Sequence, residues 1–417
     1  MYSIKRVLFF LTLISALLPA PVLFAATLEC GPGKPLKTLS SAVSVAQAND
    51  KILLFAGTYH ESLVHIRKPL TIEGIGMPVI DGGENKDVIT IEGDHISIKG
   101  IEIRNSGKST SRDYAGIKMV NSSHCVIEHC RFINNFFSMH LDHSKQCIIK
   151  NNYLNGNAKT ETASGNGIHI WKCDSFSILF NKIERHRDGI YFEFVRNSRI
   201  ISNVSNNNLR YGLHFMFSDY DSYHYNIFSN NGAGVAVMYT QHIDMKGNTF
   251  TKNWGPTSYG LLLKDINFSR ISGNSFIGNT VGIQMENANK LRIQGNNFSQ
   301  NGWAMRIMGN CEYDTVVANN FIGNSFDLST NSSGTGNLNV LEANFWDKYK
   351  GYDLNRDKTG DIPYRPVSLF SMFVESVPSA VVLLHSFMID VMDEVEKNLP
   401  SLIPVTLVDS KPKMKKN

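Results

Sequence analysis

One phrase recurs along the chain, as in Gly189-Ile190-Tyr191-Phe192, Gly212-Leu213-His214-Phe215 and Gly234-Val235-Ala236-Val237. It consists of a Gly, an apolar residue, any residue and a second apolar residue. Further copies begin at Gly116, Gly167, Gly260 and Gly282, while Ser138 and Ala304 replace the Gly in two more. The period is nearly constant, with longer steps only from Ser138 to Gly167 and from Gly234 to Gly260. Such a period indicates stacked units, each of which buries its apolar face against its neighbours.

A second signal, a single Asn, has the same period. It comprises Asn152, Asn181, Asn203, Asn226, Asn248, Asn274, Asn296 and Asn319. Its two long steps match those of the first phrase, so each marks a loop inserted into one coil. Short alternating runs such as Ser198-Arg199-Ile200-Ile201 predict strands rather than helices. We therefore expect an all-β fold, a right-handed parallel β-helix of roughly 22-residue coils, stacked about 4.8 Å apart with a ladder of Asn side chains.

The N-terminal segment 1–26 has the layout of a secretory signal peptide. Lys5 and Arg6 precede an apolar run, and Ala25-Ala26 supply small residues before a cut at Thr27. Glu29 argues against a lipid anchor at Cys30. Removing this segment lowers the formal net charge from +4 to +2, which argues against a nucleic-acid partner. The predicted organisation is a signal peptide over 1–26, a β-helix over 27–350 and a C-terminal loop and helical tail over 351–417.

Both ends of the stack need covers that block further edge pairing. Leu39 to Ala48 predicts a short N-terminal capping helix, and the repeat fades after Asn344-Phe345-Trp346. In the tail, apolar residues recur at helical spacing between Pro378 and Pro400. They are Leu384, Met388, Val391, Met392, Val395 and Leu399. This helix either docks on a membrane-protein partner or packs on the end of the stack as a cap.

Residues 353–361 place oxygen side chains at alternate positions, like the beginning of a calcium loop. The Gly that should follow Asp357 and the distal Glu are missing, so a structural turn is the stronger interpretation and calcium the weaker one.

Alternation predicts which side chains leave the stack. If Ile168 and Ile170 point into the core, His169 and Trp171 point outward. The same rule places His140, His169, Tyr191 and His214 in one outward column. A second column beside it contains Asp142, Trp171, Glu193, Met216 and Met238.

The two columns contain groups that bind copper in its two oxidation states, namely imidazole, carboxylate and thioether. Met216 and Met238 are one period apart and should be neighbours across one coil step, with His214 on the same face. We predict a copper site at these three residues. His169, His140, Glu193 and Asp142 are nearby candidates. The alternative is an ordinary solvated or carbohydrate-binding surface.

The six cysteines contain no CxxC pair, so a zinc knuckle or thioredoxin-like site is not indicated. Cys125 and Cys147 are also one period apart and should stack, either as a disulfide or as two buried free thiols.

Several longer phrases resemble the NosD family. They are Asp188 to Glu193, Leu209 to Phe217, Gly232 to Tyr239, Gly282 to Glu286, Gly302 to Ala304 and Pro363 to Phe370. The resemblance covers nearly the whole mature chain. It implies a periplasmic protein, held at the inner membrane by an ABC transporter membrane subunit, that works in the maturation of the copper centres of nitrous oxide reductase. It also implies contact with a copper chaperone and with the reductase itself.

Three functions compete at this stage. The first is a non-catalytic copper-transfer scaffold. The second is a carbohydrate-active β-helix enzyme, such as a lyase, hydrolase or epimerase, which needs an acid/base set in a groove. The columns offer Asp142, Tyr191, Glu193 and histidines for it, but methionines contribute nothing to sugar chemistry. The third is an adaptor that joins the transporter to its client without binding metal.

Overall fold

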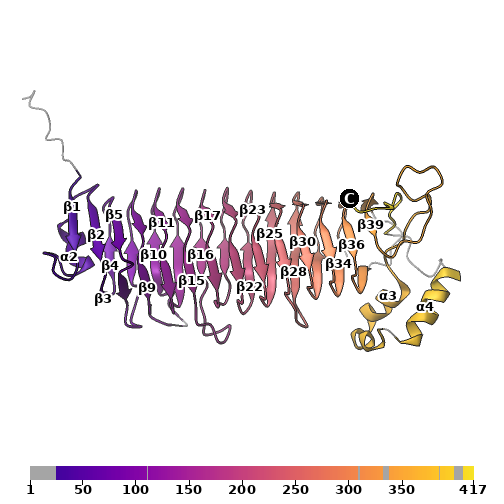
Figure 1. Ribbon diagram of the computed structural model, residues 1–417, viewed down its shortest axis with the longest axis horizontal. Helices are drawn as coiled ribbons and strands as arrows, with labels where there is room; N and C mark the ends of the chain where they lie inside the picture. The colour runs from indigo at the N-terminus through magenta and orange to yellow at the C-terminus, as the bar shows by residue number, and fades with distance from the viewer. Residues whose placement is uncertain (1–24, 110, 309, 332–337, 385, 399–406) are drawn as a thin grey trace, which may run out of the picture.

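The protein is a long stack of coils with helices at its two ends (Figure 1). The computed structural model describes residues 25–109, 111–308, 310–331, 338–384, 386–398 and 407–417. The predicted signal peptide lies almost entirely outside the described residues. Each coil contributes strands to three parallel sheets, named A, B and C below. The expected parallel β-helix is therefore confirmed.

Sheet A contains the strand that opens each coil. Its strands are Thr27–Cys30 (β1), Lys51–Phe55 (β2), Thr71–Ile75 (β5), Ser97–Lys99 (β8), Val126–Glu128 (β11), Ile148–Lys150 (β14), Ser177–Leu179 (β17), Arg199–Ile201 (β20), Ser222–His224 (β23), Asp244–Lys246 (β26), Arg270–Ser272 (β29), Arg292–Gln294 (β32), Thr315–Val317 (β35) and Val340–Glu342 (β38).

Sheet B follows after a tight turn. Its strands are Thr58–His60 (β3), Val79–Asp81 (β6), Glu102–Arg104 (β9), Arg131–Ile133 (β12), Tyr153–Asn155 (β15), Lys182–Glu184 (β18), Val204–Asn206 (β21), Ile227–Ser229 (β24), Thr249–Thr251 (β27), Ser275–Ile277 (β30), Asn297–Ser299 (β33), Asn320–Ile322 (β36) and Phe345–Trp346 (β39).

Sheet C carries the recurring Gly phrase. Its strands are Val64–Ile66 (β4), Ile89–Ile91 (β7), Ala115–Val120 (β10), Phe137–Asp142 (β13), Ile168–Trp171 (β16), Ile190–Glu193 (β19), Tyr211–Met216 (β22), Ala233–Gln241 (β25), Tyr259–Asn267 (β28), Val281–Glu286 (β31), Trp303–Ile307 (β34) and Phe326–Thr330 (β37). The two long steps of the repeat are loops between sheets B and C, one from β15 to β16 and one from β27 to β28.

The core consists of side chains stacked from coil to coil. Phe250, Phe276, Phe298 and Phe321 form one buried ladder, with ring centroids 4.6 to 4.9 Å apart, and it ends on Trp346. Burying each such ring contributes roughly 1.5–3 kcal/mol, so every coil is stabilised mainly by its neighbours.

The predicted Asn ladder is present and buried. Asn181 donates from its backbone N and its side-chain Nδ2 to Oδ1 of Asn203, at 2.8 and 3.0 Å, and each ladder member repeats this pattern on the next coil. The ladder continues to Asn344. A second buried ladder, which sequence analysis missed, precedes sheet C. It consists of Asn208, Asn231, Asn253, Asn279, Asn301 and Asn324. Both ladders satisfy turn amides that would otherwise be buried without partners.

The six cysteines are free thiols and all are buried. The backbone N of Cys125 lies 3.4 Å from Sγ of Cys147, so the expected stacking is real and the free-thiol alternative holds. Burial raises the pKa of the Cys130 thiol to about 12, which keeps it unreactive.

The N-terminal cover is the helix Leu39–Val45 (α2), capped by the Thr38 side chain. It ends before the predicted Ala48. The chain turns there because Asp50 accepts a hydrogen bond from the Gln47 backbone and Asn49 has a positive φ of 72°. This turn leads directly into β2.

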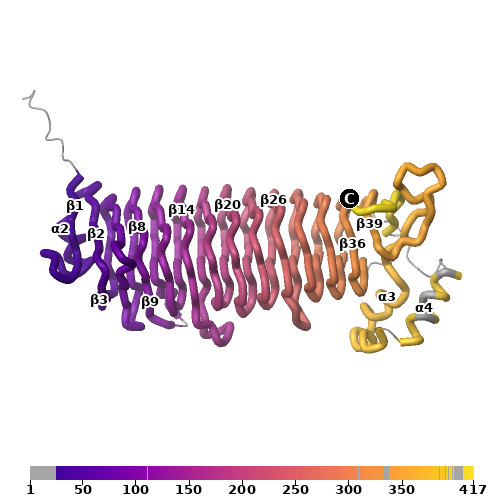
Figure 2. Tube along the Cα trace, viewed as in Figure 1, coloured from indigo at the N-terminus to yellow at the C-terminus, as the bar shows by residue number. Residues whose placement is uncertain are grey.

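The C-terminal residues cover the other end of the stack. Figure 2 shows the last residues returning beside β39. Asp409 is fully buried, and its Oδ2 accepts from the backbone N and Nδ2 of Asn344 and from Nε1 of Trp346, each at 3.0 Å. The first Asn ladder therefore ends on a carboxylate contributed by the tail.

The tail contains the helices Leu369–Ser376 (α3) and Phe387–Asn398 (α4), joined by the 3-10 helix Pro378–Leu383 (η1). Sequence analysis predicted α4 but missed α3; the predicted Leu399 and Pro400 lie outside the described residues. On α3, Phe370 contacts Phe326 of β37 and Glu375 pairs with Arg306 of β34. Within the described residues, no helix is both long and apolar enough to cross a bilayer.

The predicted apolar stripe is divided between two environments. Leu384 and Met392 pack on the small core that joins α3 to β37. Met388, Val391 and Val395 are exposed, as are Val382 (83%) and Phe387 (81%). One part of the tail is therefore a cap, and another part presents an apolar surface to the solvent.

Residues 353–361 form a turn in which the carboxylates accept backbone N–H groups. Asp353 accepts from Asp357 and Lys358, and Asp361 accepts from Leu354. These oxygens are used in holding the loop, as the structural-turn interpretation predicts.

Candidate functional site

The first outward column lies on sheet C across four consecutive strands. The register pairs His140 with His169, His169 with Tyr191 and Tyr191 with His214. Their ring centroids are 4.8 Å apart at every step. The strand flanks of these residues, such as Leu213 and Phe215, are fully buried in the core. Alternation thus places the column as the repeat predicts.

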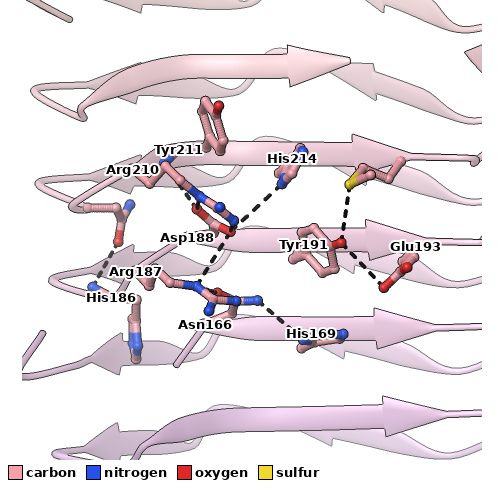
Figure 3. A network of polar contacts seen from close by, with 12 residues as sticks. Asn166, His169, His186, Arg187, Asp188, Tyr191, Glu193, Arg210, Tyr211 and His214 are labelled. Carbon is pink, nitrogen blue, oxygen red and sulfur yellow. Dashed lines mark hydrogen bonds and ion pairs between the residues drawn. The ribbon is translucent and has the colours of Figure 1, made fainter. Parts of the chain in front are cut away.

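The second column lies two positions further along the same strands. The register pairs Asp142 with Trp171, Trp171 with Glu193, Glu193 with Met216 and Met216 with Met238. Tyr191 connects the two columns, because its hydroxyl lies 3.3 Å from Oε2 of Glu193 and 3.4 Å from Sδ of Met216 (Figure 3). A phenol, a carboxylate and a thioether therefore meet at one place.

The histidines are more enclosed than an outward direction suggests. His214 is 5% exposed, because its ring is packed between those of Tyr191 and Tyr211. Among the residues that the structure describes, neither of its ring nitrogens has a hydrogen-bond partner, and a buried polar atom left in this state is costly. Burial lowers the pKa of His140, and it lowers that of His169 to about 3. The latter ring is neutral at physiological pH, which is the form that binds metals.

A buried charge lies behind the column. Asp188 is fully buried and accepts from Nε and Nη2 of Arg210, at 2.9 and 2.5 Å. Burial alone would raise the pKa of Asp188, but the hydrogen bonds and charge of Arg210 outweigh it and lower the pKa to about 2. Its Oδ2 also lies 3.8 Å from Nδ1 of His214. Sequence analysis missed Asp188 and Arg210, although both lie in phrases that resemble the NosD family.

The far end of the column is a different environment. Asp142 is hydrogen-bonded to His143, and Nε2 of His140 lies 3.7 Å from Asp113. These residues are three coils away from Met216. In the part of the chain that the structure describes, no three or more His, Cys, Asp or Glu side chains are grouped so as to hold a metal ion. The predicted copper site differs from such a group, because two of its three residues, Met216 and Met238, are thioethers.

A separate cavity of about 780 Å³ lies at the C-terminal end, between β37 and the tail. Asp327, Lys348, Tyr364 and Arg365 line it, and two of these belong to the phrase Pro363 to Phe370. Burial raises the pKa of Asp327 to about 6. Sequence analysis had no signal for this cavity, because its walls come from distant parts of the chain.

Solved structures with the same architecture share little sequence with this chain. The A-module of a mannuronan C-5 epimerase from Azotobacter vinelandii is 13% identical, with a TM-score of 0.52, and the match covers 75% of this chain and 91% of that one. The adhesin PfbA of Streptococcus pneumoniae is 14% identical, with a TM-score of 0.56, covering 72% and 97%. An enzyme and an adhesin are about equally similar to this chain, so these structures show its fold alone.

Sequence relatives are more specific. A family model described as "Periplasmic copper-binding protein (NosD)" matches residues 155–351. The "Probable ABC transporter binding protein NosD" of Stutzerimonas stutzeri is 24% identical over 379 residues, covering 86% of each chain. Its counterpart from Pseudomonas aeruginosa is 26% identical over 387 residues, covering 89% of each. The matched region contains the outward columns from His169 to Met238, and these likenesses together support membership of the NosD family.

Proposed function

We propose that this protein is a non-catalytic periplasmic scaffold that handles copper and works with an ABC transporter to assemble the copper centres of nitrous oxide reductase. The observation that supports the proposal is the placement of His214, Met216, Met238 and Glu193 on three adjacent strands of one face of sheet C. His214 contributes a buried ring whose Nε2 has no hydrogen-bond partner among the described residues. Met216 and Met238 are register partners on adjacent strands.

This donor set suits a cargo that changes its oxidation state. Thioethers are soft ligands that favour Cu(I), whereas imidazole also binds Cu(II) and the carboxylate of Glu193 favours harder ions. The three classes lie within neighbouring coils, so copper held here can be released to a partner without a large movement of the stack. Copper is then cargo that passes over the protein, and the protein supplies binding and orientation.

The proposed partners are supported by the names of the relatives and by an exposed apolar surface on the tail. The two relatives are named for binding to an ABC transporter. We assign contact with the membrane subunit of such a transporter to the exposed apolar surface of η1 and α4, which includes Val382 and Phe387. This contact would hold the protein at the inner membrane. A copper chaperone and nitrous oxide reductase are the other proposed partners.

The carbohydrate-active alternative is less well supported by the geometry. Acid/base catalysis needs side chains that touch the substrate, yet His214 and Tyr191 are only 5% and 9% exposed. Exposed rings do follow the second column at Phe194, Phe217 and Tyr239, but they stack on one another at 5.1 Å and within 14° of parallel. They therefore present edges to the solvent, whereas sugars stack on ring faces.

Copper binding by the purified mature chain tests the proposed function. We expect tight Cu(I) binding under reducing conditions, measured by competition with a chromophoric chelator, and weaker Cu(II) binding under oxidising conditions. Absence of binding in both conditions would contradict copper handling and favour the adaptor. Conversion of a uronic-acid polymer by the same preparation would favour the enzyme.

The docking surface makes a separate prediction. Changing Val382, Phe387 and Met388 to Ser should abolish co-purification with the transporter while leaving the melting temperature unchanged, because these side chains are exposed. The substitutions spare α3 and residues 407–417, which cover the stack. Changing the exposed Phe180 and Trp254 to Ser is the matched control, since both lie on the coils. Retained co-purification of the triple variant would place the transporter contact elsewhere.

A further inference from the structure

A series of polar contacts links two histidines of the first column beside Tyr191 (Figure 3). Two of its steps are close contacts longer than a hydrogen bond, namely Nε of Arg187 to Oδ2 of Asp188 at 4.0 Å and Oδ2 of Asp188 to Nδ1 of His214 at 3.8 Å. From His169 the series runs through Asn166 and Arg187 to Asp188, and from there to His214. The distances are 3.2 Å from Nδ1 of His169 to Nδ2 of Asn166, and 3.2 Å from Oδ1 of Asn166 to Nε of Arg187. The proton positions along this series follow from what each group can donate or accept.

At the His169 end, Arg187 sets the direction of the hydrogen bonds, because an arginine side chain has only donors. Nε of Arg187 donates to Oδ1 of Asn166, so the amide must present its NH₂ group to His169. Nδ1 of His169 therefore accepts, and the single proton of the neutral ring resides on Nε2. Asn166 is fully buried, so water does not compete for these bonds.

At the His214 end, the group next to Nδ1 is an acceptor instead of a donor. Asp188 is clamped by Arg210 and also accepts from the backbone N of Tyr211, so its carboxylate has only acceptors to offer. Nδ1 of His214 lies 3.8 Å from Oδ2, which is longer than a hydrogen bond, but the negative charge of the carboxylate favours a proton on this nitrogen. Nε2 keeps its lone pair and has no partner among the described residues. Metal-binding histidines are typically held in this way, with a carboxylate on the other ring nitrogen.

We propose that Asp188 and Asn166 impose opposite tautomers on the two histidines, so that His214 offers copper a lone pair on Nε2 while His169 does not. Asp188 is then a positioning residue for His214, and Asn166 removes His169 from the set of ligands. The ligand part of this inference rests on the proposed copper function, whereas the tautomers do not. If both tautomers are as proposed, the predicted copper site is limited to the His214 end of the column.

Nitrogen NMR of the ¹⁵N-histidine-labelled, copper-free protein tests the tautomers directly. Spectra of His169→Gln and His214→Gln assign the two rings. We expect the proton of His214 on Nδ1 and that of His169 on Nε2. A proton on Nε2 of His214, or on Nδ1 of His169, overturns the proposal. This measurement needs no substitution at Asp188.

Two reciprocal substitutions test whether Asp188 and Asn166 determine the two tautomers. In Asp188→Asn the amide oxygen should keep the Oδ1 position, which accepts from Nε of Arg210 and the backbone N of Tyr211. Its NH₂ group then replaces Oδ2 beside His214, with loss of the bond from Nη2 of Arg210, and should move the ring proton to Nε2. Cu(I) affinity should then fall about 10–100-fold. Asn166→Asp should move the proton of His169 to Nδ1. Asp219→Asn is the control for fold, because it removes a carboxylate paired with Arg196 outside the column.

The outcomes separate the two proposals. A switched tautomer of His214 with unchanged copper affinity overturns its role as an Nε2 ligand. An unswitched tautomer in a folded Asp188→Asn overturns the role of Asp188. Correct tautomers in a wild-type protein that binds no copper support the tautomer assignment and contradict the copper function.

Discussion

Replacing His214, Met216 and Met238 together by Ala is expected to lower Cu(I) affinity by at least about 100-fold, because removing a neighbour of a metal ligand already costs about 10–100-fold. The three residues contribute the imidazole and the two thioethers of the proposed site. The measurement is competition with a chromophoric Cu(I) chelator on the mature chain. Circular dichroism should remain strand-rich, since the stacked core residues such as Leu213 and Phe215 are untouched.

The matched control changes the same residue types elsewhere. His129, Met77 and Met388 are exposed and lie outside the two columns, so their replacement by Ala should leave copper affinity as in the wild type. Unchanged copper binding in the folded site variant would show that the copper site is elsewhere. Equal loss in both variants would indicate non-specific binding to surface methionines and histidines.

The second large effect is expected at Asp409. Its Oδ2 accepts three hydrogen bonds from Asn344 and Trp346, and all the groups involved are buried. Asp409→Ala leaves three donors without partners, at roughly 1–3 kcal/mol each, so the terminal coil should lose at least about 3 kcal/mol of stability. Hydrogen exchange of the β38 and β39 amides measures this locally, which suits a stack whose coils do not unfold as one unit.

Asp409→Asn is the matched variant, because its Oδ1 still accepts from Asn344. We expect it to restore most of the protection that Asp409→Ala loses. Equal protection in the wild type and Asp409→Ala would contradict the role of this carboxylate as the end of the ladder.

The repeat was sufficient to predict the coils and the two columns. Because residues such as Met216 and Met238 recur with the period of one coil, their pairing follows from spacing alone. Spacing could not reveal that His214 is buried, because alternation gives a direction and the neighbouring ring of Tyr211 decides the exposure. Sequence analysis also missed the polar contacts that set the tautomers, because Asn166 belongs to a loop inserted between β15 and β16.

The tail shows a second limit of prediction from the sequence. Asp409 lies 65 residues after Asn344, and no local pattern connects them. Helix α3 was missed because its eight residues are too short to show a clear period, and its contacts with β34 and β37 decide its structure.

Because each coil adds one strand to each sheet, the length of the stack changes in steps of one strand spacing. The strand that carries His214 (β22) and the last strand of sheet C (β37) are five steps apart in the sheet. At about 4.8 Å a step, the proposed copper ligands stand roughly 24 Å from the end that carries the tail. Adding or deleting one coil between them would change this reach by a single step and leave both ends intact. If the tail binds the transporter as proposed, the number of coils sets the distance between the transporter and the proposed copper ligands.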